Sequence, residues 1–216
     1  MAISTAISRF AEYYKRHGLW ASVRRTRLAV RRALFSSRMV LFYCDLSKQT
    51  SPPPDLPSFL KVERKKSSAE LSLEDLEAVT SFWNPKLARR NMEERFGKGA
   101  SLWLIKSQDR LAGFSWTIRG RTIGPFYFPM AEDDVQFFDW LVFPKFRGRA
   151  ILWFLVTYIL DRLRAEGVAR AFGDAAEWNQ ASLSSYKMIP FRRLGLARKL
   201  TILGHTIVSW PDNRVP

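Results

Sequence analysis

One stretch of the chain constrains its fold more than any other, because a strand runs through a basic turn into a long amphipathic helix. Residues 135–143 are rich in aromatic side chains, which favours a strand, and Pro144 ends it. Residues 148–166 carry apolar side chains at helical spacing, and Gly167 ends the pattern. The apolar positions of this helix are Ile151, Leu155, Ile159 and Leu163. Such a unit is typical of sheets that carry helices on their faces.

The segments around this unit alternate between strand and helix patterns. Two apolar runs, 102–106 and 111–118, are separated by four polar residues, which is the pattern of an antiparallel hairpin. Ser72 is the expected N-cap of a helix. The other strands are expected at 59–64, 122–128, 168–174 and within 200–210, and the helices at 72–82, 85–96 and 180–187. The order predicts an α/β (α+β) domain with a central mixed β-sheet flanked by helices.

The N-terminal part of the chain differs from the rest in charge. Residues 1–38 hold nine basic side chains and one acidic one, a net charge of +8 out of +15 for the whole chain. Apolar residues recur there at helical spacing, which predicts a basic amphipathic helical appendage over residues 1–46, including a strand-like run at 39–43. The four prolines of residues 47–58 predict a linker. The main folded domain is therefore expected at residues 59–216.

This basic segment indicates an anionic partner, and a membrane surface, a nucleic acid and an acidic protein all qualify. The apolar stripes fit two roles equally well. Residues 1–38 either contact an anionic membrane surface or pack their apolar stripes on the folded domain. Nucleic acid is the weaker expectation, because the arginines come without a base-reading motif. The longest near-apolar run, residues 150–160, is too short to cross a bilayer.

The cysteine and histidine content argues against a disulfide, a thiol nucleophile and a metal centre. Cys44 is the single cysteine, which excludes an internal disulfide, and no histidine lies near it in the sequence to activate it as a nucleophile. His17 and His205 are too few and too far apart for a metal centre, so no metal is expected. The expected location is cytoplasmic, with peripheral association at the inner membrane face, although a mitochondrial transit peptide has a similar composition.

The basic turn between the strand and the long helix has the features of an anion site. Gly148 permits a tight turn, and the amides of residues 147–152 are expected to point outward at a helix N-terminus. Arg147 and Arg149 add positive charge where a pyrophosphate would bind. The alternative is a basic turn with a purely structural role.

A second group of polar residues follows the next strand. Asn179, Ser182 and Tyr186 are spaced by three and four residues, which places them on one face of a short helix. Two helix starts after two adjacent strands can open a crevice for an extended cofactor. Tyr186 taken alone is also consistent with a packed core aromatic.

These two motifs give the chain its resemblance to a known family. Residues 60–203 resemble the GNAT superfamily of acyl-CoA-dependent N-acyltransferases, most closely in VFPKFRGR at 142–149 and WNQASLSSYKMIPF at 178–191. The resemblance implies acetyl-CoA or a longer acyl-CoA as donor, and a Tyr186 that assists departure of the thiolate. The implied cofactor-binding residues are Leu141, Val142, Arg147, Gly148, Arg149, Ala150, Ile151, Leu152, Asn179 and Ser182.

The turn departs from the family pattern at two positions. The family usually has Gly where this chain has Ala150, and Gly or Ala where it has Leu152. The added side chains are expected to hinder the approach of phosphates to the backbone. A later Gly-Phe pair of the family is Pro190-Phe191 here.

The resemblance implies transfer of an acetyl or longer acyl group to an amine acceptor. Both a small-molecule amine and a sugar amine are open, and an amino sugar of a surface-polysaccharide pathway is one candidate. Asp139 is the first candidate for the proton acceptor, and spacing alone does not separate it from Asp174 or Glu177. The alternative function is a non-catalytic module that binds nucleic acid or protein through its basic face. The sequence indicates no oligomeric state. Aromatic candidates for an acceptor pocket are Trp116, Phe126, Tyr127, Phe128 and Trp140.

Overall fold

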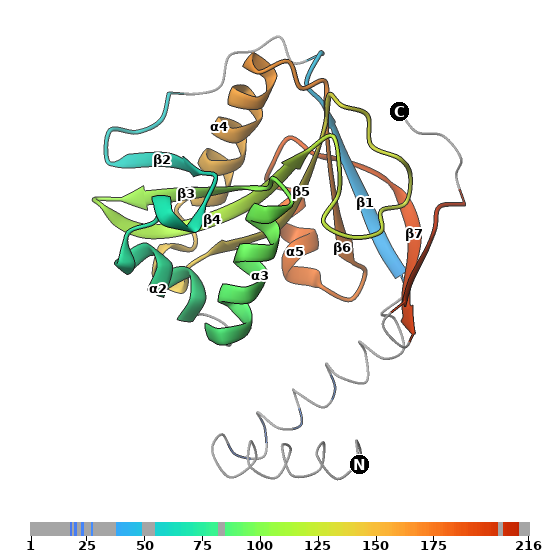
Figure 1. Ribbon diagram of the computed structural model, residues 1–216, viewed down its shortest axis with the longest axis horizontal. Coiled ribbons are helices and arrows are strands. Elements are labelled where there is room, and N and C mark those ends of the chain that lie inside the picture. The colour runs from blue at the N-terminus through green and yellow to red at the C-terminus, as the bar shows by residue number, and fades with distance from the viewer. Residues whose placement is uncertain are drawn as a thin grey trace.

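The computed structural model of the chain describes residues 38–48, 55–81, 85–202 and 205–211, together with four single residues closer to the N-terminus. This part of the chain builds one mixed sheet with helices on both faces (Figure 1). The strands are β1 (Arg38–Asp45), β2 (Leu60–Lys65), β3 (Ser101–Ser107), β4 (Arg110–Arg119), β5 (Asp134–Val142), β6 (Arg170–Ala176), β7 (Arg192–Ile202) and β8 (His205–Ser209). The helices are α2 (Leu73–Ser81), α3 (Pro85–Gly97), α4 (Ile151–Ala165) and α5 (Gln180–Tyr186), with short 3-10 turns η1 (Ser68–Glu70) and η2 (Pro144–Phe146).

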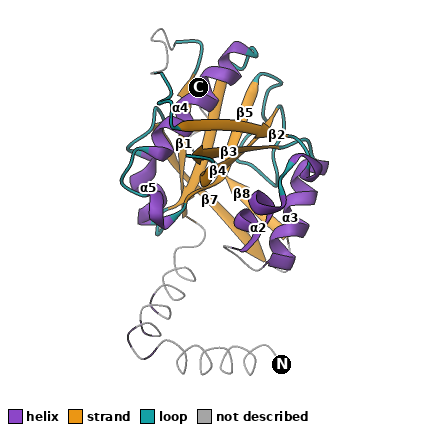
Figure 2. Ribbon diagram, turned by 90° about the vertical axis from the view of Figure 1, so that its left-hand side faces the viewer, coloured by secondary structure: helices purple, strands orange, loops and turns teal. Residues whose placement is uncertain are grey.

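The strand order across the sheet is β2-β3-β4-β5-β6-β1-β7-β8. Neighbouring strands are antiparallel except β5 and β6, which run parallel. Figure 2 shows α4 and α5 on one side of the sheet and α2 and α3 on the other. The predicted fold class, a central mixed β-sheet flanked by helices, is confirmed.

Most predicted elements of the domain form at their expected places. The hairpin of β3 and β4 is antiparallel, and the Ser72 hydroxyl accepts a hydrogen bond from the Asp75 amide at 3.1 Å, which caps α2 as predicted. The closing strands also form, although β7 begins at Arg192, well before the expected residue 200. No helix in the described part of the chain has the length and apolar character that crossing a membrane requires.

The long helix forms as α4, but it begins at Ile151 instead of residue 148. Gly148 and Ala150 have φ angles of 77° and 55°, which lie outside the α-helical region, and η2 occupies the preceding residues. The predicted apolar positions of α4 are buried in the main core. Gly167, with a φ of 78°, ends the helix as predicted.

β1 corrects the predicted division of the chain. Residues 38–45 were assigned to the N-terminal appendage, yet they lie inside the sheet and pair with both β6 and β7. β1 precedes the proline-rich stretch 47–58 and β2 follows it, so this stretch joins two strands of one sheet. Residues 1–37, apart from four single positions, lie outside the described residues, and their helices stay a prediction.

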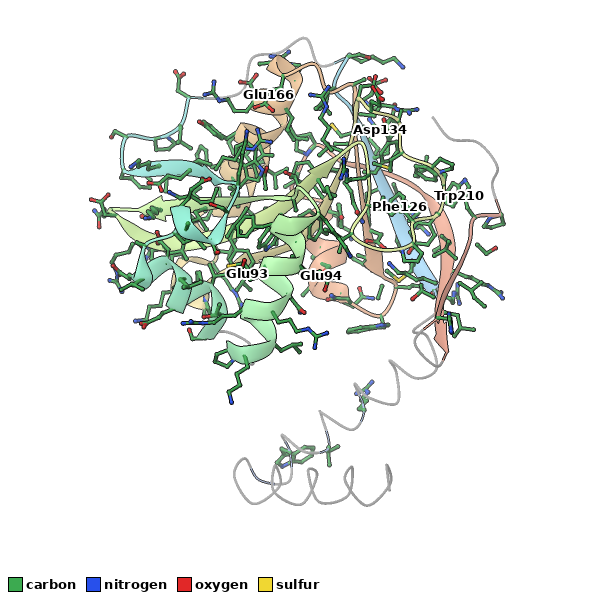
Figure 3. All side chains as sticks on the ribbon, viewed as in Figure 1. Glu93, Glu94, Phe126, Asp134, Glu166 and Trp210 are labelled. Carbon is green, nitrogen blue, oxygen red and sulfur yellow. The ribbon has the colours of Figure 1, made fainter. Side chains whose placement is uncertain are left out.

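The strand predicted at residues 122–128 does not form, and this segment consists of bends and loops. Pro125 and Pro129 lack the N–H groups that a strand would donate. The aromatic side chains pack instead against β1, β6 and β7, in a cluster that includes Phe126 and Trp210 (Figure 3). Hydrophobic burial of these residues therefore occurs without strand pairing.

The sheet opens between its two central parallel strands. β5 and β6 pair only from Asp134–Arg170 to Phe137–Gly173, and β5 continues beyond this point without β6. Asp139 has a φ of 44°, and the register between β4 and β5 shifts next to it. This irregularity turns the end of β5 away from β6. The fold thereby creates a gap at the centre of the sheet.

Candidate active site

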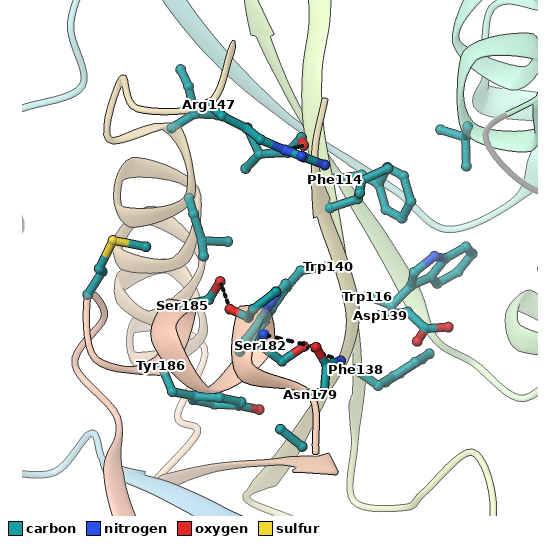
Figure 4. Close-up of a pocket in the computed structure, with 18 of the residues that line it drawn as sticks. Phe114, Trp116, Phe138, Asp139, Trp140, Arg147, Asn179, Ser182, Ser185 and Tyr186 are labelled. Atoms are coloured by element: carbon teal, nitrogen blue, oxygen red, sulfur yellow. Dashed lines mark hydrogen bonds between the residues drawn. The ribbon is translucent and has the colours of Figure 1, made fainter. Parts of the chain in front are cut away.

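A cavity of about 1280 Å³ lies where β5 and β6 separate. Residues from both sides of the sheet line it, including α3 on one side and α4 and α5 on the other. Figure 4 shows Trp140 and Tyr186 on the α5 side of β5, and Trp116, Phe138 and Asp139 on the opposite side. A cavity lined from both faces can hold two molecules that meet at the sheet.

The turn before α4 offers backbone donors to this cavity. Ala150 is the N-cap, and its carbonyl accepts from the Phe154 amide at 3.0 Å, so the amides of residues 151–153 have no partner inside the helix. These amides and the helix dipole favour an anion. The prediction that the whole turn offers free amides is wrong for Arg147, whose N–H donates to the Pro144 carbonyl at 3.3 Å.

The side chains of the turn differ in whether they face the cavity or pack in the core. Arg147 lines the cavity, and its Nε donates to the Val142 carbonyl at 3.2 Å. Leu152, whose bulk was expected to crowd the phosphates, is 8% exposed and packs in the main core. Ala150 adopts the left-handed backbone that Gly would adopt at lower cost, a difference of about 1 kcal/mol.

The structure gathers eleven of the twelve predicted site residues around this cavity. They are Asp139, Leu141, Val142, Arg147, Gly148, Ala150, Ile151, Leu152, Asn179, Ser182 and Tyr186. The exception is Arg149, which is exposed and is not a lining residue. Two motifs separated in the sequence therefore meet at one place.

Asn179 and Ser182 form the start of α5. The Asn179 side chain accepts from the Ser182 amide at 3.3 Å and donates to the Ser182 hydroxyl at 2.8 Å. These two bonds cap the helix, so both side chains already have partners within the protein. Their position on the cavity wall, visible in Figure 4, fixes the orientation of α5 and of Tyr186 at its end.

Tyr186 is buried and its ring is held by other aromatic rings. It stacks on Phe42 of β1 with a centroid distance of 3.6 Å and meets Trp140 at 4.6 Å. A Cβ atom placed on Gly173 would overlap the Tyr186 hydroxyl, so the glycine leaves room for that hydroxyl beside β6. Burial, followed by the negative charge of Asp174, raises the pKa of Tyr186 well above 10. The hydroxyl therefore stays protonated and can act as a hydrogen-bond donor.

Asp174 follows Gly173 on β6 and lines the cavity. The Tyr127 hydroxyl donates to Asp174 Oδ2 at 2.9 Å. Burial, then the nearby charge of Asp174, raises the pKa of Tyr127, so this donor is not lost to ionisation. No basic side chain among the described residues forms an ion pair with Asp174. Its charge is available to a cationic or proton-donating group in the cavity.

The other two candidate carboxylates already have basic partners. Asp139 forms an ion pair with Arg95 of α3. Glu177 pairs with Arg38 Nε at 2.8 Å and is absent from the cavity wall. Of the three candidates, Asp174 is thus the cavity carboxylate without a described counter-cation.

The sequence did not identify Arg95. Its guanidinium lies 5.2 Å from the Trp116 ring centre and 5.3 Å from that of Phe138, and its side chain is 20% exposed. The spacing from Met92 could have indicated its position. Arg95 follows the buried Met92 by three residues and therefore lies on the sheet-facing side of α3. A basic residue on the buried side of a helix needs an acidic or aromatic partner.

The predicted aromatic lining residues fall into two groups. Trp116 and Trp140 line the cavity. Phe126, Tyr127 and Phe128 are not among its lining residues and pack in the cluster beside β1 and β7. In the described part of the chain, no group of three or more His, Cys, Asp or Glu side chains could hold a metal ion.

Two solved structures share this fold. An acetyltransferase from the GNAT family of Colwellia psychrerythraea is 9% identical with a TM-score of 0.52, over 75% of this chain and 54% of that one. A glucosamine N-acetyltransferase region of a fungal multi-domain GH3 β-N-acetylglucosaminidase is 15% identical with a TM-score of 0.51, over 81% of this chain and 22% of that one. At these identities the likeness concerns the fold. The chain spans about half the length of the bacterial structure and a smaller share of the fungal one.

A family model assigns the family directly. The model described as Acetyltransferase (GNAT) family matches residues 69–189, which is more than half of the 216 residues. No curated protein matches the chain. The matched range includes the opening between β5 and β6, the turn before α4 and all of α5. The chain belongs to the acetyltransferase (GNAT) family.

Proposed function

We propose that the chain transfers an acyl group from acyl-CoA to the amine of a small acceptor. One observation carries this proposal: the buried hydroxyl of Tyr186 and the carboxylate of Asp174 both border the cavity that passes through the opened sheet. The donor supplies an activated thioester. An amine acceptor agrees with the match to the acetyltransferase (GNAT) family.

The α4 side of the cavity suits the donor. The amides of residues 151–153 and the Arg147 guanidinium provide hydrogen bonds and positive charge for a pyrophosphate. Leu141 and Val142 lie on the part of β5 that has no β6 partner, so their backbone can bond an extended chain. The Val142 carbonyl accepts from Arg147 Nε and has a second lone pair for another donor.

Asp174 and Tyr186 have separate roles in the reaction, one as proton acceptor and one as hydrogen-bond donor. Asp174 takes the proton that the acceptor amine loses as its nitrogen bonds to the acyl carbon. Tyr186 donates a hydrogen bond to the departing sulfur as the carbon–sulfur bond breaks. Because its pKa lies above the value of about 8.5 typical of a thiol, Tyr186 keeps its proton, and exchange with solvent protonates the free thiolate. Asp139, the first candidate from the sequence, instead helps Arg95 to bind the acceptor.

The opposite side of the cavity suits an acceptor with both polar and apolar faces. Trp116 and Phe138 supply aromatic surface, and Asn91, Arg95 and Asp139 supply polar groups. A ring that carries hydroxyl groups and an amine, as in an amino sugar, matches this combination, so we propose an amino sugar as the acceptor. The test is a panel of amino sugars, amino acids and simple amines with acetyl-CoA and longer acyl-CoA, read as release of free thiol. Transfer to simple amines but to no amino sugar would contradict this acceptor class. If calorimetry detects no binding of acyl-CoA, the proposed acyltransferase activity is contradicted.

Arg147→Ala should weaken acyl-CoA binding by about 1–3 kcal/mol, because it removes a charge-assisted hydrogen bond at the turn. Arg149→Ala is the matched control, since Arg149 lies two residues away, carries the same charge and is not a lining residue. Calorimetry with acetyl-CoA should show an unchanged Kd for this control. Equal losses in both variants would contradict a specific role of Arg147.

We also propose that the basic N-terminal segment contacts an anionic membrane surface. Arg38 belongs to β1, so the deletion that tests this role ends at residue 37. The full chain should sediment with anionic vesicles at low salt and lose most of this binding at high salt. Deletion of residues 1–37 should reduce the binding several-fold and leave acyl transfer to a soluble acceptor intact. Equal sedimentation with neutral vesicles would contradict the electrostatic role.

A further inference from the structure

The hairpin of β7 and β8 carries an exposed apolar surface that the acyl-transfer reaction does not use. Leu196 and Leu200 lie on the same face of β7, and Ile207 of β8 pairs with Leu200. Their exposed fractions are 37%, 41% and 62%. We call these three residues the hairpin face. Aliphatic side chains gathered in this way on an edge hairpin favour contact with another apolar surface.

The segment that contains the hairpin carries charge of one sign. Residues 178–211 contain five Lys and Arg residues and no Asp or Glu. Arg193 and Arg198 are exposed and form no ion pair with any described residue. Arg198 alternates with Leu196 and Leu200 along β7 and therefore lies on the same face. The hairpin face thus lies beside two arginines whose charge is not paired with any described residue.

The hairpin also extends beyond its neighbours in the sheet. β1 begins at Arg38, which pairs with Arg198, so the residues of β7 after Arg198 pair only with β8 in the described part of the chain. In Figure 1 this end of β7 points away from α2, α3 and α4. The protruding end can reach a flat surface without interference from those helices.

We propose that the hairpin face docks on an anionic lipid bilayer, with Leu196, Leu200 and Ile207 inserted among the lipids and the arginines at the headgroups. Such a bilayer satisfies both properties of the surface, since it accepts apolar side chains and carries negative charge. A nucleic acid would pair with the arginines but leave the aliphatic side chains in water. A second copy of the chain carries the same formal charge of +15 and would repel the first.

This docking is separate from the acyl-transfer proposal but compatible with it. Arg38 pairs with Arg198, so the basic residues 1–37 join the sheet next to the hairpin. The membrane contact proposed for that segment and the contact of the hairpin face can therefore occur together. Met39 lines the cavity and pairs with Ala197 of β7, so the cavity wall includes a residue of the strand next to the hairpin.

The test is sedimentation of the full-length protein with vesicles of phosphatidylcholine, alone or mixed with phosphatidylglycerol. The double variant Leu200→Ser/Ile207→Ser should bind the anionic vesicles about tenfold more weakly, because apolar insertion is lost without a change of charge. The matched control is Phe59→Ser/Leu73→Ser, which replaces two exposed apolar residues away from the hairpin. This control should bind within about twofold of the wild-type protein.

A second pair of variants tests orientation. Arg193→Glu/Arg198→Glu should weaken binding more than tenfold, whereas Arg89→Glu/Arg90→Glu on α3 changes the net charge equally and should cost far less. Equal losses in the two charge variants, or wild-type binding by Leu200→Ser/Ile207→Ser, would overturn the proposal. Binding to duplex DNA that depends on the arginines but not on Leu200 and Ile207, without vesicle binding, would assign the face to nucleic acid. All four double variants should transfer the acyl group to a soluble acceptor at the wild-type rate. A loss of vesicle binding can therefore be distinguished from a failure of the proposed enzymatic function.

Discussion

Tyr186→Phe is expected to lower kcat by about 10- to 1000-fold while leaving acyl-CoA affinity nearly unchanged. The variant keeps the ring that stacks on Phe42 and packs against Trp140, so the cavity wall is preserved. It removes only the hydroxyl beside Gly173, which is the proposed donor to the departing sulfur. Single-turnover measurement of thiol release, combined with calorimetry, separates the chemical step from binding.

Tyr158→Phe of α4 is the matched control, since Tyr158 is outside the cavity wall and should leave kcat unchanged. The pH profile gives a further check. The pKa of Tyr186 is raised well above its ordinary value of 10, so ionisation of this hydroxyl should cause no falling limb in kcat below about pH 10. A kcat of Tyr186→Phe equal to that of the wild type, under conditions where chemistry limits turnover, would leave Tyr186 as a packing residue.

Asp174→Asn is expected to lower kcat/KM by about 100- to 10,000-fold, the range for loss of a positioned proton acceptor. The amide is nearly the same size and can still accept the hydrogen bond from Tyr127. What it loses is the carboxylate that is proposed to accept the proton of the amine. Steady-state assay of thiol release measures this loss, and calorimetry with acetyl-CoA should show a Kd close to that of the wild type, a result that a purely structural defect of the cavity would not give.

Asp139→Asn gives the comparison within the same cavity. Asp139 is paired with Arg95, so we expect its amide variant to raise KM for the acceptor with a smaller effect on kcat. A larger loss of kcat in Asp139→Asn than in Asp174→Asn would return the proton-accepting role to Asp139. Assays of both variants with one acceptor and one acyl-CoA decide between these carboxylates.

Local patterns in the sequence predicted the parts of the site that depend on short spacing. The turn at residues 147–152 and the helix with Asn179, Ser182 and Tyr186 follow from the positions of Pro, Gly and polar residues, and the structure brings them together at one cavity. The order of strand and helix patterns was sufficient for the fold class, because alternating elements of this kind form a sheet covered by helices. The family model supports the same assignment.

Features that depend on distant contacts were not predictable in this way. The pairing of β1 with β6 and β7 joins residues far apart in the chain, and a proline-rich stretch looks the same whether it joins two domains or two strands. The pairing of Arg95 with Asp139 likewise depends on how α3 lies on the sheet. At residues 122–128 the aromatic content favours a strand, but the prolines prevent the hydrogen-bond ladder. The aromatic side chains of this segment pack in a buried cluster without forming a strand.

The central place of β1 has a consequence for the order of events during synthesis. β1 leaves the ribosome long before its partners Arg170–Ala176 and Arg192–Ile202 are made. Until then the apolar residues Val40, Leu41 and Phe42 have no strand to pair with, although β2 to β5 can already form their antiparallel half of the sheet. Long-range pairing of this kind slows folding and prolongs exposure of apolar surface. The nascent chain therefore depends on β6 and β7, and a ribosome that stalls before β6 leaves β1 unpaired and prone to aggregation.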